Sequence, residues 1–95
     1  MAAYLIARLS IRDPAAYSEY TARTPAIIAQ YGGRFLVRGG PTETLEGATC
    51  SERVVVVEFP SMEVARAYYN SPEYQAAKSL RTPVSEAELI LVPGV

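Results

Sequence analysis

The chain has 95 residues, of which 49% are hydrophobic and 20% are charged, a composition typical of one globular domain rather than of a disordered segment. Nine Lys and Arg residues against ten Asp and Glu residues give a formal net charge of −1, so we expect no nucleic-acid partner. The chain has no histidine and a single cysteine, which excludes histidine-based metal, haem and catalytic sites and an internal disulfide. We therefore expect no cofactor and no metal ion.

A strand and a helix are predicted first. Residues 3–11 carry apolar side chains at every odd position, as a strand does. Asp13-Pro14 then predicts a helix start, because the aspartate accepts hydrogen bonds from first-turn amides and the proline has no amide to satisfy. Pro25 interrupts the helical pattern, so either the helix kinks there or Thr24 caps a second short helix. Gly32-Gly33 predicts the helix end, since glycine adopts the left-handed backbone readily.

The rest of the chain predicts three strands and a broken helix. Residues 34–38 and 53–59 are the next strands, separated by a polar segment with short extended structure expected at 42–45. Ser61 is predicted to cap the second helix, which breaks at 70–72 and resumes at 73–80, and residues 88–92 form the last strand. The order β-α-β-β-α-β predicts an α+β fold, a ferredoxin-like sandwich with a four-stranded antiparallel sheet and the helices on one face.

Both faces of the predicted sheet are apolar. A sheet with one face in water alternates between apolar and polar side chains, whereas the four consecutive valines at 54–57 place valine on both faces. No segment remains to cover the second face, and so large an apolar patch is unusual on a monomer. We therefore predict a homodimer in which the open sheet faces of two copies pack against each other.

Four segments of the sequence are similar to a known family. They are Asp13-Pro14 with the tyrosines that follow, Tyr31-Gly32-Gly33-Arg34 continuing to residue 40, residues 58–61 and residues 69–75. Through them the chain resembles the family called Domain of Unknown Function 1330, in the dimeric α/β-barrel superfamily, over nearly its whole length as a single domain. The resemblance departs in the loop 48–52 and around Thr82-Pro83. It implies a ferredoxin-like protomer that pairs into a barrel, and it implies no particular reaction.

Charged residues that continue the apolar strand patterns are the first candidates for a site. Arg8, Arg38 and Glu58 each extend one alternating set, and the set of Arg38 is predicted to include Arg34. If these sets share a face, an arginine–carboxylate cluster lies at one end of the barrel or in a cleft between sheet and helices. There the guanidinium would bind a carboxylate or an enolate-like charge. The alternative is a structural ion pair that fixes the register of the dimer.

A second candidate lies at the predicted helix break. Tyr69 and Ser71 flank the start of the helix that follows Pro72, where unpaired amides can meet an anion. The alternative is ordinary helix capping by Ser71. Tyr17 and the other tyrosines of the first helix are interpreted as core packing, and Cys50, in a polar loop, as an incidental thiol.

Two functions remain open from the sequence. The first is binding or transformation of a small organic molecule, a carboxylate or an aromatic, without metal or haem. The second is a non-catalytic dimerisation or sensing module with no substrate. Neither assigns a reaction or a catalytic residue. Arg8 interrupts the N-terminal apolar run, and no run approaches the roughly 20 residues that span a bilayer, so we expect a cytoplasmic protein without a membrane partner.

Overall fold

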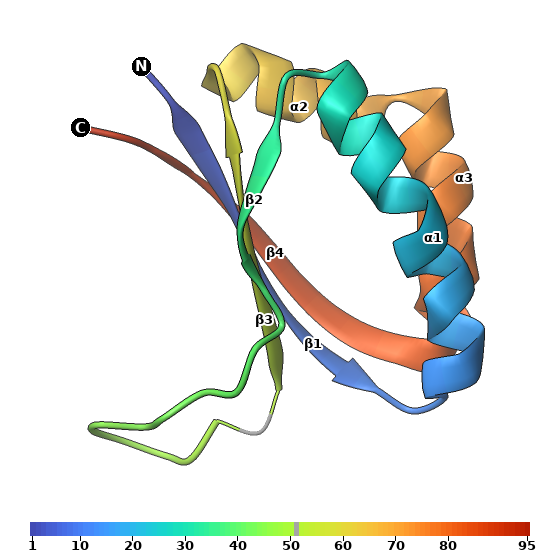
Figure 1. The fold of residues 1–95 in the computed structure, drawn as a ribbon, viewed down its shortest axis with the longest axis vertical. Helices are drawn as coiled ribbons and strands as arrows, with labels where there is room; N and C mark the ends of the chain where they lie inside the picture. The colour runs from blue at the N-terminus through green and yellow to red at the C-terminus, as the bar shows by residue number, and fades with distance from the viewer. Residues whose placement is uncertain (51) are drawn as a thin grey trace.

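The fold has two layers, a sheet and three helices that cover one of its faces (Figure 1). The computed structural model describes residues 1–50 and 52–95. The elements in chain order are β1 (Ala3–Ile11), α1 (Pro14–Gln30), β2 (Arg34–Arg38), β3 (Arg53–Phe59), α2 (Met62–Asn70), α3 (Pro72–Arg81), the short 3₁₀ helix η1 (Thr82–Val84) and β4 (Ser85–Pro93).

The four strands form one antiparallel sheet in the order β2-β3-β1-β4. β1 is central, and its Ala7 lies opposite Val55 of β3 and Leu89 of β4. This arrangement confirms the predicted ferredoxin-like fold.

The core lies between the sheet and the helices. Along β1 the odd positions are buried, and Val57 and Phe59 of β3 are each 1% exposed on the same side. The helices contribute Tyr68 from α2 and Tyr74 from α3, which are 2% and 0% exposed. The strand periodicity of two therefore places one complete set of side chains against the helices and leaves the other set on the opposite face.

Side-chain caps define the helix ends as the sequence predicts. Asp13 accepts a hydrogen bond from the Ala16 amide at 3.2 Å, and Ser61 accepts one from the Val64 amide at 3.2 Å. α1 continues through Pro25 as a single helix, so the alternative of a second helix beginning there is wrong. Gly32, with φ of +72°, follows the helix end and takes the left-handed conformation expected of it.

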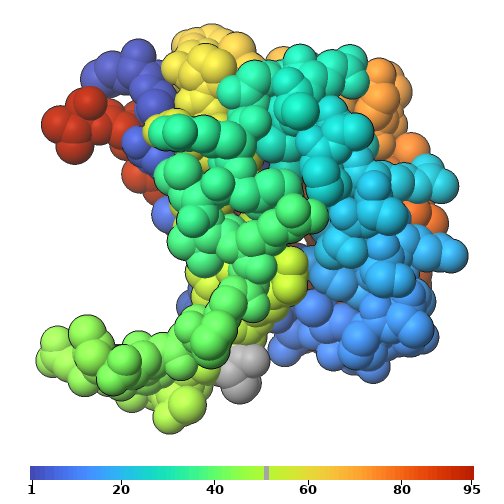
Figure 2. Space-filling view, in the orientation of Figure 1, coloured from blue at the N-terminus to red at the C-terminus, as the bar shows by residue number. Residues whose placement is uncertain are grey.

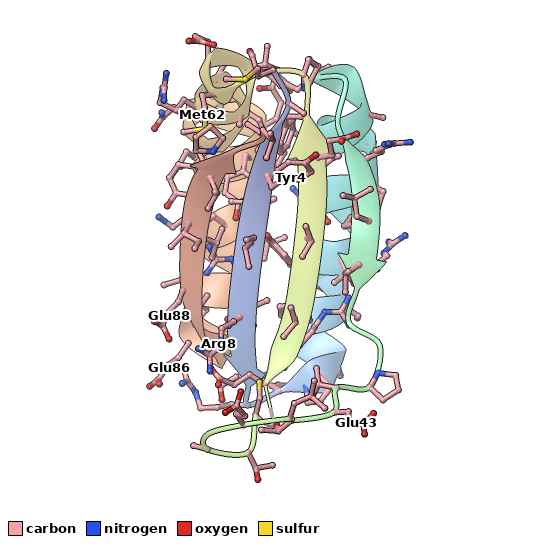
Figure 3. The ribbon with its side chains drawn as sticks, turned by 90° about the vertical axis from the view of Figure 1, so that its left-hand side faces the viewer. Tyr4, Arg8, Glu43, Met62, Glu86 and Glu88 are labelled. Atoms are coloured by element: carbon pink, nitrogen blue, oxygen red, sulfur yellow. The ribbon has the colours of Figure 1, made fainter. Side chains whose placement is uncertain are left out.

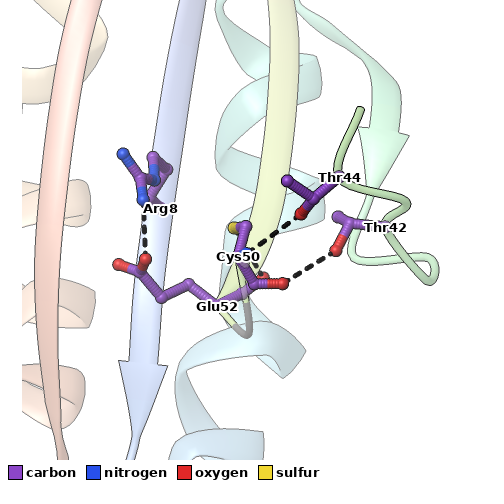
Figure 4. A network of polar contacts seen from close by, with 5 residues as sticks. All are labelled: Arg8, Thr42, Thr44, Cys50 and Glu52. Atoms are coloured by element: carbon purple, nitrogen blue, oxygen red, sulfur yellow. Dashed lines mark hydrogen bonds and ion pairs between the residues drawn. The ribbon is translucent and has the colours of Figure 1, made fainter. Parts of the chain in front are cut away.

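Residues 39–50 form a long loop without strand structure, the β2–β3 arm, which projects from the sheet on the side away from the helices (Figure 1). The extended structure expected at 42–45 is wrong, because the arm closes on itself instead. The Thr42 hydroxyl donates to the Cys50 carbonyl and the Cys50 amide donates to the Thr44 hydroxyl, each at 3.1 Å (Figure 4). Within the described residues, no helix combines the length and apolar composition that crossing a membrane requires.

Candidate functional site

The open face of the sheet carries an apolar centre between two charged ends. In the middle, Ile6 lies opposite Val56 of β3 and Ile90 of β4. The space-filling view shows this side hollowed between the arm and the chain termini (Figure 2). The strongly exposed large apolar side chains of the described residues lie in β2, β4, the arm or the termini, and none of them lies in a helix. They are Met1, Leu36, Val37, Leu45, Ile90, Val92 and Val95.

One end of the open face is built around Glu58. Arg34 Nε donates to Glu58 Oε1 at 2.7 Å, and the Tyr4 hydroxyl donates to Glu58 Oε2 at 3.1 Å. The hydrogen bonds from Arg34 and then Tyr4 hold the pKa of Glu58 below its ordinary value of 4.5. The hydrogen bond to Glu58 raises the pKa of Tyr4, which therefore stays a neutral donor near pH 7.

Arg8 lies at the other end of the same face, four positions along β1 from Tyr4, the residue that pairs with Glu58. Arg8 Nη2 contacts Glu52 Oε1 at 2.7 Å (Figure 4). Glu86 and Glu88 of β4 lie beside Arg8 at this end of the sheet (Figure 3). Tyr4 is the β1 partner of Glu58, so Arg8 and Glu58 are about 13 Å apart along the strand. The structure does not bring them into one cluster.

Arg38 lies on the opposite side of the sheet from Arg34. A bulge between Phe35 and Val37 shifts the β2–β3 register, so Val37 faces Val56 while Arg38 pairs with Val55 on the helix side. The expectation that Arg34 and Arg38 belong to one alternating set is therefore wrong, because one extra residue moves the following side chains to the other face.

A cavity lies between α1 and the sheet, and Arg38 is at its mouth, since this residue is exposed and lines the cavity. The volume is about 40 Å³, which holds about three water molecules. Its wall is mostly apolar and aromatic, with two arginines and two threonines. The lining residues include Leu5, Leu9, Tyr17, Tyr20, Thr21, Thr24, Phe35, Arg38, Arg53 and Val55.

Arg53 is the most unusual group in this wall. Its Nε is buried without a hydrogen-bond partner, and no carboxylate of the described residues forms an ion pair with it. The guanidinium carbon lies 6.0 Å from the centre of the Tyr17 ring. The side chain also crosses the backbone of Gly39, whose φ is +75°, and a Cβ at Gly39 would overlap the guanidinium. The glycine thus leaves the space in which Arg53 reaches the cavity.

Tyr17 completes the polar part of the wall. It is 6% exposed, and burial raises its pKa despite the opposing effect of Arg53. Its phenol therefore keeps its proton at neutral pH. Together, two arginines and a protonated phenol surround an apolar space, an arrangement suited to an organic anion. No cluster of three acidic or cysteine side chains that could hold a metal ion is found in residues 1–50 and 52–95.

The two candidates at the helix break have structural contacts. Ser71 is 4% exposed, accepts from the Tyr74 amide at 3.1 Å and donates to the Tyr68 carbonyl at 2.7 Å. Its hydroxyl joins α2 to α3, which is the capping alternative. Tyr69 lies away from the cavity, and its hydroxyl accepts a hydrogen bond from Lys78 at 2.8 Å.

Two arginines with a buried, unpartnered Nε, Arg53 and Arg81, are not among the candidates predicted from the sequence. The sequence places Arg53 at the start of a strand, directly before four valines. An arginine next to so apolar a run could have indicated a charged side chain beside the core. Arg81 is 5% exposed and follows Tyr74 and Ala77 at positions i+7 and i+4 of the buried stripe of α3. That periodicity could have identified it.

The fold and these contacts define a small ferredoxin-like α+β protein with an apolar open face and an arginine-lined cavity. The family described as Domain of unknown function (DUF1330) matches residues 2–95, and the chain belongs to this family. No curated protein matches the sequence.

Solved structures share the fold at low sequence identity. A protein of unknown function from Rhodopseudomonas palustris is 18% identical with a TM-score of 0.78, covering 99% of this chain and 82% of that one. A dimeric ferredoxin-like protein of unknown function from Bacteroides fragilis is 15% identical, with a TM-score of 0.67 and coverage of 98% and 96%. SnoaB, a cofactor-independent oxygenase from Streptomyces nogalater, is 18% identical, with a TM-score of 0.64 and coverage of 99% and 93%.

Proposed function

We propose that this protein is a homodimer that binds a small aromatic carboxylate, or a molecule with an enolate-like anion, in the cavity between α1 and the sheet. The observation that carries the proposal is the buried, unpartnered Nε of Arg53 in a wall that is mostly apolar and aromatic. A buried donor without an acceptor is costly, and an anionic ligand supplies the acceptor. Neither metal nor haem takes part in this binding.

The shape and chemistry of the wall support this ligand class. Phe35 and Tyr17 line the cavity, and their aromatic rings suit contact with an aromatic molecule. Arg38 is stacked at 4.4 Å over Phe35 and is exposed, so it can move aside to admit a ligand and then pair with its acidic group. The structural likeness to SnoaB, described as a cofactor-independent oxygenase, shows a shared fold and assigns no ligand or residue role, because the sequence identity is only 18%.

The dimer uses the open face of the sheet. Two sheets packed face to face bury the apolar centre around Ile6, Val56 and Ile90, and similar proteins are described as dimeric. The β2–β3 arm projects on the same side and carries Leu45, which is 86% exposed. In the dimer the arm would contact the second copy. Glu58 and Arg34 would then lie at the dimer interface, where their ion pair fixes the register.

A second candidate function is a dimerisation module without a ligand. The small volume of the cavity, about 40 Å³, favours it, since no aromatic molecule enters without movement of the wall. Under this alternative Arg38 and Arg53 only cover the core, and replacing them changes stability alone.

Binding assays separate the two functions. The probes are benzoate, phenylacetate and salicylate, with benzyl alcohol as the neutral comparison, measured by calorimetry and thermal shift. We expect the acids to bind, and Arg38→Ala or Arg53→Met to weaken binding about tenfold or more, the loss that follows removal of a charged hydrogen bond. Arg66→Ala is the control, because Arg66 lies on α2 with its own surface partner, Glu63. Equal affinities for wild type and the two variants would refute the assignment of this site.

A further inference from the structure

A groove between α3 and β4 lies beside the cavity and is lined by different polar groups. Its volume is about 460 Å³, within the range of about 300–1,000 Å³ typical of small-molecule sites. One wall is aliphatic, with Ala87, Leu89 and Leu91 of β4. The other wall carries Lys78 and Arg81 of α3 together with Tyr69.

Arg81 is a buried cation without an acidic partner. It is 5% exposed, its Nε has no hydrogen-bond partner, and no carboxylate of the described residues forms an ion pair with it. Its contacts are phenols: Nη2 donates to the Tyr74 hydroxyl at 3.2 Å, and the guanidinium carbon lies 5.5 Å from the Tyr20 ring centre. Burial opposes the charge and is the largest single effect, but the hydrogen bonds and charge interactions with Tyr74 and Tyr20 together outweigh it, so the pKa of Arg81 is raised. The buried group is therefore a full positive charge.

A charge of this kind calls for an anion. Taking a guanidinium out of water is costly unless an opposite charge compensates it, and a neutral phenol does not supply that charge. Tyr20 keeps its proton because burial raises its pKa. Among the described residues, no carboxylate lies within ion-pair distance of Arg81.

Lys78 adds a second cation to the same wall. It lies three residues before Arg81, one helical turn away, so both side chains reach the same side of α3. Lys78 Nζ donates to the Tyr69 hydroxyl at 2.8 Å and lies 5.1 Å from the centre of that ring. An ammonium has three donors, so two remain for a ligand.

From this juxtaposition we infer that the groove between α3 and β4 is a second binding site, which takes an aliphatic monocarboxylate. The carboxylate pairs with Arg81 and Lys78 while the hydrocarbon chain lies along Ala87, Leu89 and Leu91. The apolar wall distinguishes this ligand from a bare inorganic anion, and the aliphatic lining distinguishes it from the aromatic acid proposed for the neighbouring cavity.

The test adds hexanoate to the full chain, with hexanol and inorganic phosphate as comparisons. Binding is detected by NMR of the methyl groups. Ala87 and Leu91 line the groove and not the cavity, whereas Ala7 and Leu9 line the cavity and not the groove. We expect hexanoate to shift the Ala87 and Leu91 methyl signals at concentrations at which hexanol and phosphate do not. Shifts confined to Ala7 and Leu9, or equally tight binding of hexanol or phosphate, would overturn the inference.

Substitutions then assign the charges. Lys78→Met is expected to raise the dissociation constant for hexanoate about tenfold or more while benzoate binding in the cavity is unchanged. Arg81→Met is also expected to raise the dissociation constant for hexanoate about tenfold or more. If the Arg81→Met protein does not fold, Lys78→Met alone decides the test. Arg66→Met, on the exposed surface of α2, is the matched control. Unchanged hexanoate binding by Lys78→Met would contradict the site, whatever the outcome for benzoate.

Discussion

The substitution Arg53→Met separates a ligand-binding arginine from a structural one. The native side chain leaves Nε buried without an acceptor, which costs about 1–3 kcal/mol. Its contact with the Tyr17 ring, at 6.0 Å from guanidinium carbon to ring centre, returns about 0.5–1 kcal/mol. Methionine has a similar reach, keeps the apolar packing on Tyr17 and has no donor to satisfy.

The empty Arg53→Met protein should therefore be more stable than wild type by about 1 kcal/mol. For a domain of this size that corresponds to a melting temperature higher by about 4–8 °C. Urea denaturation measures the free energy of unfolding, and calorimetry with benzoate measures binding. We expect stability to rise while affinity falls about tenfold. A variant destabilised by 1 kcal/mol or more would show that Arg53 holds the fold together, and the reasoning would fail.

The remaining predictions concern the open face and the core. Ile90→Ala shortens a side chain that is 56% exposed in the protomer. The lost burial costs the dimer about 1 kcal/mol per copy, so its dissociation constant, measured by sedimentation equilibrium, should rise about thirtyfold. An unchanged dissociation constant would place the interface elsewhere. Glu58→Gln should reduce the loss of unfolding free energy between pH 7 and acid pH. The hydrogen bond from Arg34 lowers the pKa of Glu58 in the folded state, so the stabilisation by this carboxylate is present above pH 4.5 and is lost as pH falls through the lowered pKa. Urea denaturation near pH 3 and pH 7 measures the difference. Parallel curves for both proteins would contradict that linkage. Gly33→Ala sets a Cβ 2.7 Å from Phe59, so thermal unfolding should shift down by several degrees, about 1–3 kcal/mol; an unshifted transition would show that the core yields freely.

The sequence predicts those features that depend on short-range patterns. Strand periodicity predicts β1 as a strand, and in the structure its odd positions from Ala3 to Leu9 are the buried ones; Asp13 and Ser61 mark helix starts because capping needs only neighbouring amides. β4 begins at Ser85, three residues earlier than predicted, since its first residues alternate with polar side chains. The fold order followed from these elements alone.

The site was less predictable, because it depends on register. The bulge between Phe35 and Val37 turns Arg38 to the helix side, and nothing in the sequence of β2 marks that extra residue. Arg8 and Glu58 share a face but lie at opposite ends of it, a separation that requires the β1–β3 pairing to be known. Periodicity places Arg81 on the buried face of α3, but that its Nε lacks a hydrogen-bond partner follows only from the tertiary packing.

The mass of the native protein in solution tests the central claim most directly, namely that the apolar open face is covered by a second copy of the chain. Sedimentation equilibrium at micromolar concentration measures it without any substitution. The account predicts a particle of twice the 10.3 kDa chain mass. A single species of 10.3 kDa that persists at tens of micromolar would contradict it.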